Sequence, residues 1–396
     1  MKIAIFSDTH CGFKYGEERG EDAFIAMEEA MNKSLDCDLI LIAGDMFDGK
    51  VPKPEVYART AKILSKAQNA HSNAKLVSAD KEVSLTALRG IPIVTIHGTH
   101  ERRAKTMINP LHSLESSGLL IHLDMNTAVF DINGQKVAIH GFSGVSEKYA
   151  KETLDKWDPK PVPGANNIFM FHQSVDPYIY SPLDPPTIKL NELPKGFNLY
   201  ILGHIHWSDI QDLNGGKFLL TGSTTPTSIH KKEVEQPKYI FKYDGSNIDK
   251  IKLEKQRKVI IEEFEFEAGI KEKIYNLLSA IPAEDPKQIV VIKIKGTLPK
   301  DCTPPNFREI EERFKDKFIL IINKNIEEQG LENQLELFKN LKDNRLSPEE
   351  QGLRILEKQL SEMKCGINPN EIFDLLVEGN SDMIFNLLTG KQRTLA

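Results

Sequence analysis

The sequence predicts an α/β fold, because short apolar runs of strand length alternate with helical patterns and most of the runs are closely followed by Asp, His or Gly. The clearest runs are Ile3–Phe6, Leu39–Ala43, Ile93–Ile96, Ile168–Phe171 and Leu199–Leu202. A strand that ends in a carboxylate or an imidazole presents that group at the rim of its sheet, where ligands bind in open α/β sheets. We therefore expect several rims to converge on one polynuclear metal site.

Two helices are expected between the early strands. Glu21–Leu35 places Phe24 and Met27 on one face, and Pro54–Gln68 begins with Pro in its first turn, as helices often do. The polar segment between Asn69 and Arg89 is interpreted as a surface insertion. Shorter strands are expected farther along, at Ala128–Ile132, Lys136–His140, Lys217–Thr221 and Tyr239–Tyr243.

The residues that follow the strands are of the types that bind divalent metals. They form the groups Asp8-Thr9-His10, Gly44-Asp45-Met46-Phe47-Asp48, Gly98-Thr99-His100-Glu101, His172-Gln173 and Gly203-His204-Ile205-His206. Carboxylate oxygens and imidazole nitrogens suit manganese, iron and zinc, and a carboxylate between two ions can bridge them at ~3.5–4 Å. Asp45 is the predicted bridge. Around it, Asp8, His10 and His206 complete one ion, while His172 and His204 serve the other.

Single histidines carry less weight than this ordered set. His204 and His206 are two residues apart, so both rings face the same way in an extended segment. His140 and His97 either support the ligands from behind or are buried, hydrogen-bonded core residues, and we favour the core. Asp48 is either a support for the ligands or a turn residue.

The series DTH, GDMFD, GTHE, HQS and GHIH resembles the calcineurin-like metallophosphoesterases, a superfamily of dinuclear phosphoester hydrolases. Residues 43–59, with the sequence AGDMFDGKVPKPEVYAR, and the later Gly222-Ser223-Thr224 are similar to the SbcD nucleases, the prokaryotic counterparts of Mre-eleven. The resemblance covers residues 1–245 and implies a two-sheet β-sandwich flanked by helices, the metallophosphoesterase fold.

The resemblance also implies a role for each matching residue. Two Mn²⁺ ions are expected, one held by Asp8, His10, Asp45 and His206 and the other by Asp45, His172 and His204. His100 matches the catalytic histidine, which is placed to stabilise or protonate the departing alkoxide. Thr99 stands where the superfamily usually has Asn, and a hydroxyl is a poorer oxygen ligand than an amide carbonyl. We expect Thr99 to bind the second ion more weakly than Asn would, directly or through water; the alternative is an inactivated site.

The formal net charge of −6 does not favour nucleic-acid binding, because backbone affinity depends on Lys and Arg. Basic residues nevertheless follow the metal motifs, where a phosphate backbone would cross the site. The predicted DNA contacts are Lys14, Arg19, Arg102, Arg103, Lys105, Lys231 and Lys232. The alternative is an ordinary solvated, charged surface.

Four parts of the chain are expected. Residues 1–250 form the metallophosphoesterase domain, 258–325 a small α+β capping domain, 326–346 a linker and 347–390 a set of C-terminal helices. The cap is predicted from strand Val259–Phe266, helix Ile270–Ala280, strand Ile289–Ile294, helix Asn306–Phe314 and strand Phe318–Ile322. In the resembling nucleases such a cap helps to select DNA ends; the alternative is a domain for stability or dimer contacts.

The C-terminal helices have apolar faces that need a surface to cover them. Ser347-Pro348-Glu349-Glu350 is a capping box that precedes them. The predicted partner-binding residues are Leu353, Leu356, Leu360, Met363, Ile372, Phe373 and Leu376. In the SbcD-like family the corresponding tail docks on the coiled-coil base of the SbcC or Rad-fifty ATPase; the alternative is a helical bundle packed on the cap.

The cysteine content and the hydropathy of the chain indicate the cellular compartment in which we expect the protein. The chain has 4 Cys without paired spacing, which indicates a reduced intracellular environment. No apolar stretch approaches the ~20 residues that span a bilayer. We expect a cytoplasmic, nucleoid-associated protein that does not enter membranes.

The protein is also expected to form a homodimer, for which Glu21–Leu35 and Pro54–Gln68 are plausible contacts. Packing of these helices on their own sheet explains their apolar faces equally well.

The predicted function is the nuclease subunit of a DNA double-strand-break repair complex. This subunit would be a manganese-dependent exonuclease and endonuclease that acts on double-stranded DNA ends and single-stranded DNA together with an ATPase. The DNA substrate and the partner come from the resemblance, whereas the residue chemistry alone predicts a dinuclear phosphoester hydrolase. Two alternatives remain open: a small-substrate phosphatase or phosphodiesterase of the same fold, and a catalytically weak DNA-end tether.

Overall fold

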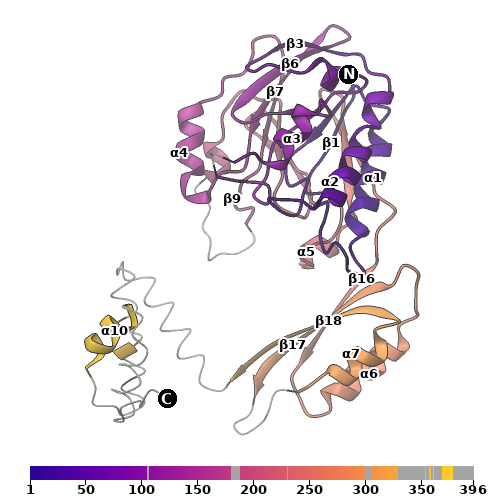
Figure 1. Cartoon of the computed structure of the whole chain (residues 1–396), viewed down its shortest axis with the longest axis vertical. Coiled ribbons are helices and arrows are strands. Elements are labelled where there is room, and N and C mark those ends of the chain that lie inside the picture. Colours follow the sequence, from indigo (N-terminus) through magenta and orange to yellow (C-terminus); the bar gives the residue numbers. More distant parts are fainter. Residues whose placement is uncertain are drawn as a thin grey trace. The chain divides into compact units, whose positions relative to one another are not determined.

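The computed structural model describes residues 1–104, 107–179, 188–229, 231–298, 305–328 and 368–377, together with Leu353, Leu356, Glu357 and Leu360. The chain divides into two compact units (Figure 1). Unit 1 contains Met1–Ile261, Ala283–Val290 and Asp316–Ile319. Unit 2 contains Glu262–Pro282, Val291–Lys315 and the described residues of Leu320–Ala396.

Unit 1 is built on two β-sheets. The 6-stranded sheet has the order β15-β14-β1-β2-β4-β5, and its strands are β1 (Ile3–Phe6), β2 (Leu39–Ile42), β4 (Ile93–Thr95), β5 (Ile121–His122), β14 (Tyr239–Tyr243) and β15 (Ile248–Lys252). The 7-stranded sheet has the order β12-β13-β11-β8-β7-β6-β3, and its strands are β3 (Ala74–Ala79), β6 (Asn126–Ile132), β7 (Gln135–Phe142), β8 (Asn166–Phe171), β11 (Leu199–Leu202), β12 (Asp209–Leu213) and β13 (Gly216–Leu220). The short strands β9 (Val175–Asp176) and β10 (Ile188–Lys189) pair with each other.

The central strands of each sheet are parallel and end together. Phe6 at the end of β1 lies opposite Ile42 at the end of β2. In the other sheet, Leu202 at the end of β11 is paired with Phe171 of β8 and with Leu220 of β13. An isolated parallel bridge between Ser7 and Ser223 then connects the segments that follow β1 and β13. The carboxyl-terminal rims of the two sheets therefore meet.

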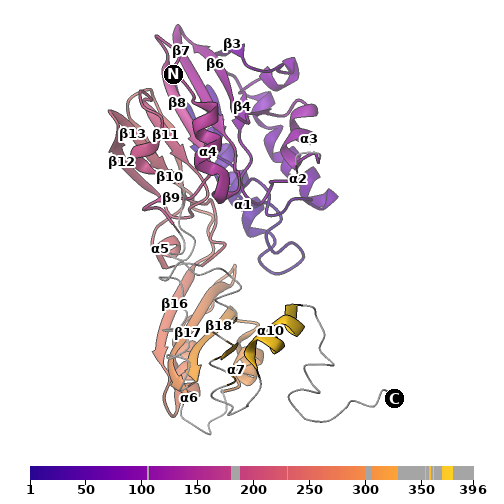
Figure 2. The same ribbon diagram turned by 90° about the vertical axis from the view of Figure 1, so that its left-hand side faces the viewer.

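Apolar side chains fill the space between the sheets and between each sheet and its helices. Ile5 and Leu41 of one sheet share a core cluster with Ile139, Met170 and Ile201 of the other. The opposite face of the 6-stranded sheet packs on α1 (Asp22–Ser34), α2 (Pro54–Leu64) and α3 (Pro110–Ser116), which Figure 2 shows on one side of unit 1. Helix α4 (Glu147–Trp157) packs on the 7-stranded sheet. The predicted two-sheet α/β sandwich flanked by helices is confirmed.

The segment interpreted as a surface insertion contains a strand. Strand β3 pairs antiparallel with β6 and lies at the edge of the 7-stranded sheet. None of its residues is fully buried, and half-buried residues alternate with exposed ones over most of its length. An edge strand with so much exposed surface has a polar composition, which explains why the sequence indicated a loop.

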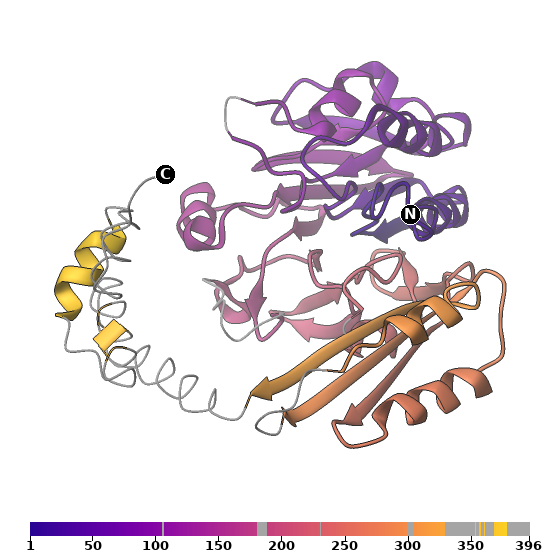
Figure 3. The same cartoon turned by 60° about the horizontal axis from the view of Figure 1, so that its bottom comes forward.

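Unit 2 contains a three-stranded sheet and several α-helices. The strand order is β16 (Val259–Glu265), β17 (Gln288–Leu298) and β18 (Phe318–Glu328), and the helices are α6 (Ile270–Ala280), α7 (Arg308–Phe314) and α10 (Pro369–Val377). Figure 3 shows the orange helices α6 and α7 running alongside the strands. These elements lie close to the expected ranges, while the domain boundaries stay a prediction. In the part of the chain described here, no helix combines the length and the apolar character that crossing a membrane requires.

A buried ion pair between Arg257 and Asp22 holds the segment that follows β15 against helix α1. The Arg257 guanidinium donates from Nη2 to Asp22 Oδ1 at 2.9 Å and from Nη1 to the Lys287 carbonyl at 2.6 Å. The side chains of Arg257 and Asp22 are each only 8% exposed. Arg19 lies on the other side of the same carboxylate, with Nε 3.4 Å from Asp22 Oδ2. Removing one partner of such a pair leaves a buried charge without full compensation.

We predict that Arg257→Met lowers the free energy of unfolding by about 3 kcal/mol, because Asp22 stays buried and keeps only Arg19. Urea denaturation followed by circular dichroism measures this loss. Lys258→Met is the matched control: Lys258 Nζ pairs with Glu284 Oε1 at 3.0 Å on the surface, and its loss should cost less than about 1 kcal/mol. If both substitutions lower the free energy of unfolding by the same amount, the buried Arg257–Asp22 pair does not have the larger contribution that we assign to it.

Candidate metal centre

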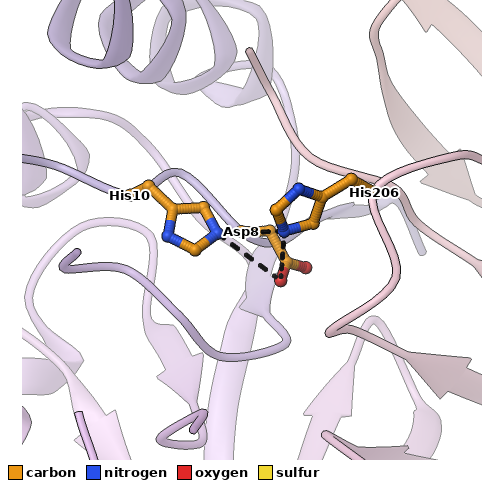
Figure 4. A group of neighbouring side chains, drawn as sticks. All are labelled: Asp8, His10 and His206. Carbon is orange, nitrogen blue, oxygen red and sulfur yellow. Dashed lines mark hydrogen bonds and ion pairs between the residues drawn. The ribbon is translucent and has the colours of Figure 1, made fainter. Parts of the chain in front are cut away.

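One group of potential ligands lies where the two sheet rims meet. Asp8 follows β1, His10 lies two residues farther on, and His206 follows β11 (Figure 4). One ligand atom from each lies within 4.8 Å of the others. His206 Nε2 is 3.1 Å from His10 Nε2 and 3.8 Å from Asp8 Oδ1. Figure 4 shows both rings pointing toward the Asp8 carboxylate.

A second group lies directly beside the first. It consists of Asp45 after β2, His172 after β8 and His204 after β11, again with ligand atoms within 4.8 Å of one another. His172 Nε2 lies 3.1 Å from Asp45 Oδ2 and 4.0 Å from Asp8 Oδ1. Because one ring approaches both carboxylates, the two groups form a single centre.

The Asp45 carboxylate is the most connected group of this centre. Its Oδ1 accepts a hydrogen bond from the His100 backbone N–H at 2.9 Å. Its Oδ2 accepts from the Thr99 hydroxyl at 3.3 Å and faces the His172 ring. The structure therefore brings the expected bridging residue into contact with the loops after β4 and β8. Thr99 lies in this centre as well, with its hydroxyl directed at Asp45.

The His172 ring is oriented by the backbone. Its Nδ1 donates to the Ala43 carbonyl at 2.8 Å, and its Nε2 lies 3.1 Å from Asp45 Oδ2, so loss of the Nε2 proton would leave a lone pair there for a cation. Metal-binding histidines commonly use this arrangement, in which a carbonyl or carboxylate fixes the tautomer. His204 lies beside it, with ring centroids 5.3 Å apart and Nε2 3.2 Å from the Ser174 hydroxyl.

Backbone conformation and close approach explain why the loops have these sequences. Asp8, His10, Asp45 and His204 all have positive φ values, of 50°, 45°, 47° and 82°. Such values are uncommon for residues other than glycine and are concentrated at functional sites. Gly98 is required for a different reason, because a Cβ there would collide with the Asp45 carboxylate.

His100 lies at the open side of the centre, and its side chain is 45% exposed. Its Nδ1 donates to the Asp48 carbonyl at 3.0 Å, and its ring centroid lies 4.8 Å from that of His10. Asp48 also approaches His10, with Oδ1 3.2 Å from Nδ1. Asp48 thus contacts both histidines and supports them, in agreement with one of its two expected roles.

Burial and neighbouring charges determine the protonation of these groups. Burial raises the pKa of Asp8 and lowers the pKa of His204 to about 3. Burial alone would lower the pKa of His172, but the Asp45 carboxylate outweighs it and raises that pKa to about 10. In return, His172 holds the pKa of Asp45 well below its usual range despite burial. Once His172 has lost its proton, the imidazoles and carboxylates packed together are a donor set that fits divalent manganese, iron or zinc.

Glu101 belongs to the motif Gly98-Thr99-His100-Glu101, but the sequence assigned it no role of its own. It is fully buried and accepts from the Phe47 N–H and the Gly98 N–H, each at 2.9 Å. It therefore joins the loop that carries Asp45 to the loop that carries Thr99. Burial raises the pKa of Glu101 to about 8. Its position next to His100 was the sequence signal for a role in the centre. Its contact with the Phe47 N–H depends on the fold and has no signal in the sequence.

The predicted DNA contacts differ in their surroundings. Lys231 and Lys232 are exposed on the short helix α5 (Lys231–Val234), Lys14 is exposed, and Arg102 and Arg103 are half-buried, whereas Lys105 lies outside the described residues. Arg19 has to be corrected. It is 2% exposed and donates to the Pro226 carbonyl while pairing with Asp22, so its charge is used inside the fold and not on a surface that faces phosphates.

His140 and His97 belong to neither ligand group. His140 is buried in the 7-stranded sheet, with hydrogen-bond contacts to Thr127 and Asn167, as expected of a core histidine. His97 is also buried, and its Nδ1 lies 3.0 Å from His122 Nε2.

The predicted partner-binding residues that the structure describes lie in unit 2. Leu360 and Ile372 are buried, Leu353, Leu356 and Phe373 are half-buried and Leu376 is 53% exposed. Met363 lies outside the described residues.

A family model described as calcineurin-like phosphoesterase matches residues 1–208. The chain belongs to this family, and it is a metal-dependent phosphoesterase by class. The superfamily predicted from the motifs is confirmed. The matched residues include each member of the two ligand groups.

Within the family, the chain is similar to proteins named DNA double-strand break repair protein Mre11. It is 26% identical to that of Methanopyrus kandleri over 58% of this chain and 50% of the relative, and 27% identical to that of Sulfolobus acidocaldarius over 76% of each. The protein of Archaeoglobus fulgidus is 24% identical over 96% of this chain and 84% of its own length. The chain thus spans about half the length of the first relative and most of the other two. The similarity to the SbcD and Mre-eleven type, which the motifs indicated, is confirmed.

We predict that metal binding at pH 8 releases about one proton from His172, because a ligating imidazole must give up the proton that the ring holds in the metal-free state. With the metal-free pKa raised to about 10, affinity should rise with pH below that value and level off above it. Titration calorimetry with Mn²⁺ in buffers of different ionisation enthalpy measures the proton count. A heat of binding that does not depend on the buffer would contradict the prediction.

Proposed function

We propose that this protein is the nuclease subunit of a DNA double-strand-break repair complex and cleaves phosphodiesters with two Mn²⁺ ions. The observation that carries the proposal is the single centre formed by Asp8, His10 and His206 next to Asp45, His172 and His204. The similarity to proteins named for double-strand break repair supports DNA as the substrate.

The two groups would each hold one ion, with Asp45 between them. When bound, two divalent ions polarise a phosphodiester and make a hydroxide nucleophile available near neutral pH. His100 supplies the proton for the leaving oxygen, because its ring is exposed at the open side of the centre. Since Nδ1 already donates to the Asp48 carbonyl, Nε2 is the nitrogen that faces a substrate, and the imidazolium form carries the transferable proton there.

DNA and the protein partners follow from the same proposal. Lys14, Arg102, Arg103, Lys231 and Lys232 are the retained candidates for contact with the phosphates of double-stranded ends and single strands. The apolar residues of the C-terminal helices would bind an ATPase of the SbcC or Rad-fifty type, and the capping domain would help to select the DNA ends. A homodimer would use the outer surfaces of α1 and α2.

A second candidate function is a DNA-end tether with little catalysis. Thr99 favours it, because a hydroxyl stands where an amide carbonyl usually binds the second ion, and that hydroxyl already donates to Asp45. The remaining alternative is that the same centre hydrolyses small phosphate esters and not DNA. The nuclease, the tether and the phosphatase predict different results in assays of DNA cleavage and small-ester hydrolysis.

We predict that the wild-type protein degrades linear DNA in the presence of Mn²⁺ and that His100→Ala lowers the rate by ~10²–10⁴-fold, the usual contribution of a general acid. Mn²⁺ binding by calorimetry should stay unchanged, because no ligand is removed. Gel analysis of end-labelled DNA gives the rate.

A chromogenic phosphodiester and a DNA-binding assay distinguish the alternatives. Hydrolysis of the small ester without DNA cleavage would favour the phosphatase. Binding of DNA ends without cleavage by either protein would favour the tether. His71→Ala serves as the control for the loss of an imidazole, because His71 is an exposed residue that belongs to neither ligand group.

Thr99→Asn should tighten the binding of the second ion by about tenfold, within the range that neighbours of a metal site contribute to affinity. The amide carbonyl restores a neutral oxygen ligand that the hydroxyl replaces poorly. Calorimetry with Mn²⁺ resolves the weaker site. Thr99→Ser keeps the hydroxyl and should behave like the wild type. An unchanged affinity in Thr99→Asn would show that the hydroxyl does not limit binding.

A further inference from the structure

A buried polar network surrounds His206 on the side away from Asp8. The ring Nδ1 lies 2.9 Å from the Thr227 hydroxyl and 3.3 Å from Glu233 Oε1. The His206 carbonyl accepts from Lys238 Nζ at 3.0 Å. Both the ring and the backbone of this residue are therefore held by groups that the sequence motifs do not include.

Glu233 is the centre of this network, and it is fully buried. Its Oε1 accepts from the Ser223 hydroxyl and the Thr227 N–H, each at 3.0 Å, and from Lys238 Nζ at 3.4 Å. Its Oε2 accepts from the Ser228 hydroxyl at 2.6 Å. A buried carboxylate is expensive unless it is paired and hydrogen-bonded, and Glu233 meets both conditions.

Lys238 balances the charge of Glu233. Its side chain is 6% exposed, and its Nζ also donates to the Ser223 hydroxyl at 2.8 Å. Ser223 follows β13 and is bridged to Ser7, the residue before Asp8. The network thus connects His206 to the strand end that carries Asp8, and it does so without exposed groups other than Ser228.

We propose that Glu233 is a positioning residue for the metal-binding function of His206. With Glu233 Oε1 3.3 Å from Nδ1, the carboxylate favours a proton on Nδ1, which leaves the lone pair on Nε2, the nitrogen on the side of Asp8 and His10. A carboxylate behind a ligating imidazole fixes its tautomer and strengthens it as a ligand, and loss of such a group typically lowers metal affinity by ~10–100-fold. The inference rests on the proposed two-ion centre.

The structure makes the effect specific to one ion. His172, in the other ligand group, is oriented by the Ala43 carbonyl and not by a carboxylate. Glu233 contacts Ser223, Thr227, Ser228, His206 and Lys238, and of these only His206 belongs to a ligand group. Its removal should therefore weaken the ion held by Asp8, His10 and His206 and spare the other.

The test is a Mn²⁺ titration of the whole 396-residue chain by calorimetry, comparing the wild type with Glu233→Gln. We expect one of two sites to weaken by ~10–100-fold while the other keeps its affinity. Glu29→Gln is the matched control: Glu29 is 7% exposed, accepts from the Glu254 and Lys255 N–H groups, each at 2.8 Å, and belongs to neither ligand group. It should lower stability and leave both affinities unchanged.

Thr227→Val decides the case if Glu233→Gln fails to fold, because it removes only the hydroxyl beside His206 Nδ1. We expect the same single site to weaken, by a smaller factor. If the wild type shows two Mn²⁺ sites and both variants fold and keep both affinities, the positioning role of Glu233 is overturned. The proposed two-ion centre would stand in that case. Wild-type protein that binds no Mn²⁺ would overturn the proposed function and this inference with it.

Discussion

The metal centre depends on the contacts of the Asp45 carboxylate. This group accepts from the His100 N–H and the Thr99 hydroxyl and pairs with the His172 ring, so it joins the loops after β2, β4 and β8. The loops come from different sheets, and their geometry is correct only while the rims of the sheets stay in register. A single carboxylate therefore links the packing of the sandwich to the placement of the catalytic candidate His100.

This arrangement has a cost that the rest of unit 1 has to offset. Several ligand candidates adopt positive φ, each at on the order of 1–3 kcal/mol, and two carboxylates are buried among imidazoles. The apolar core between the sheets and the buried pair of Arg257 with Asp22 hold the surrounding structure in place. In return, the loops are positioned before any ligand arrives, which reduces the reorganisation that binding requires.

The sequence predicted those features that local patterns encode. Asp8, Asp45, His172 and His204 follow apolar strands directly, and parallel strands that end together bring such residues to one rim. Glu233 and Lys238 were not predicted, because their role depends on contacts with residues 206 and 223 that carry no local signal. Arg19 was assigned to the surface for a related reason: a basic residue after a metal motif looks the same in sequence whether its partner is phosphate or a buried Asp22.

The two ligand groups are chemically unequal, and this follows from what lies behind each histidine. His206 is supported by the Glu233 carboxylate, whereas His172 is supported by a neutral carbonyl. A negative group behind an imidazole increases its electron donation to a cation, while a neutral one only orients it. In the second group the Thr99 hydroxyl donates to Asp45, and a carboxylate oxygen that accepts this hydrogen bond would be less available to a cation. The group that contains Asp8, His10 and His206 would therefore hold a divalent cation more tightly than the group that contains His172.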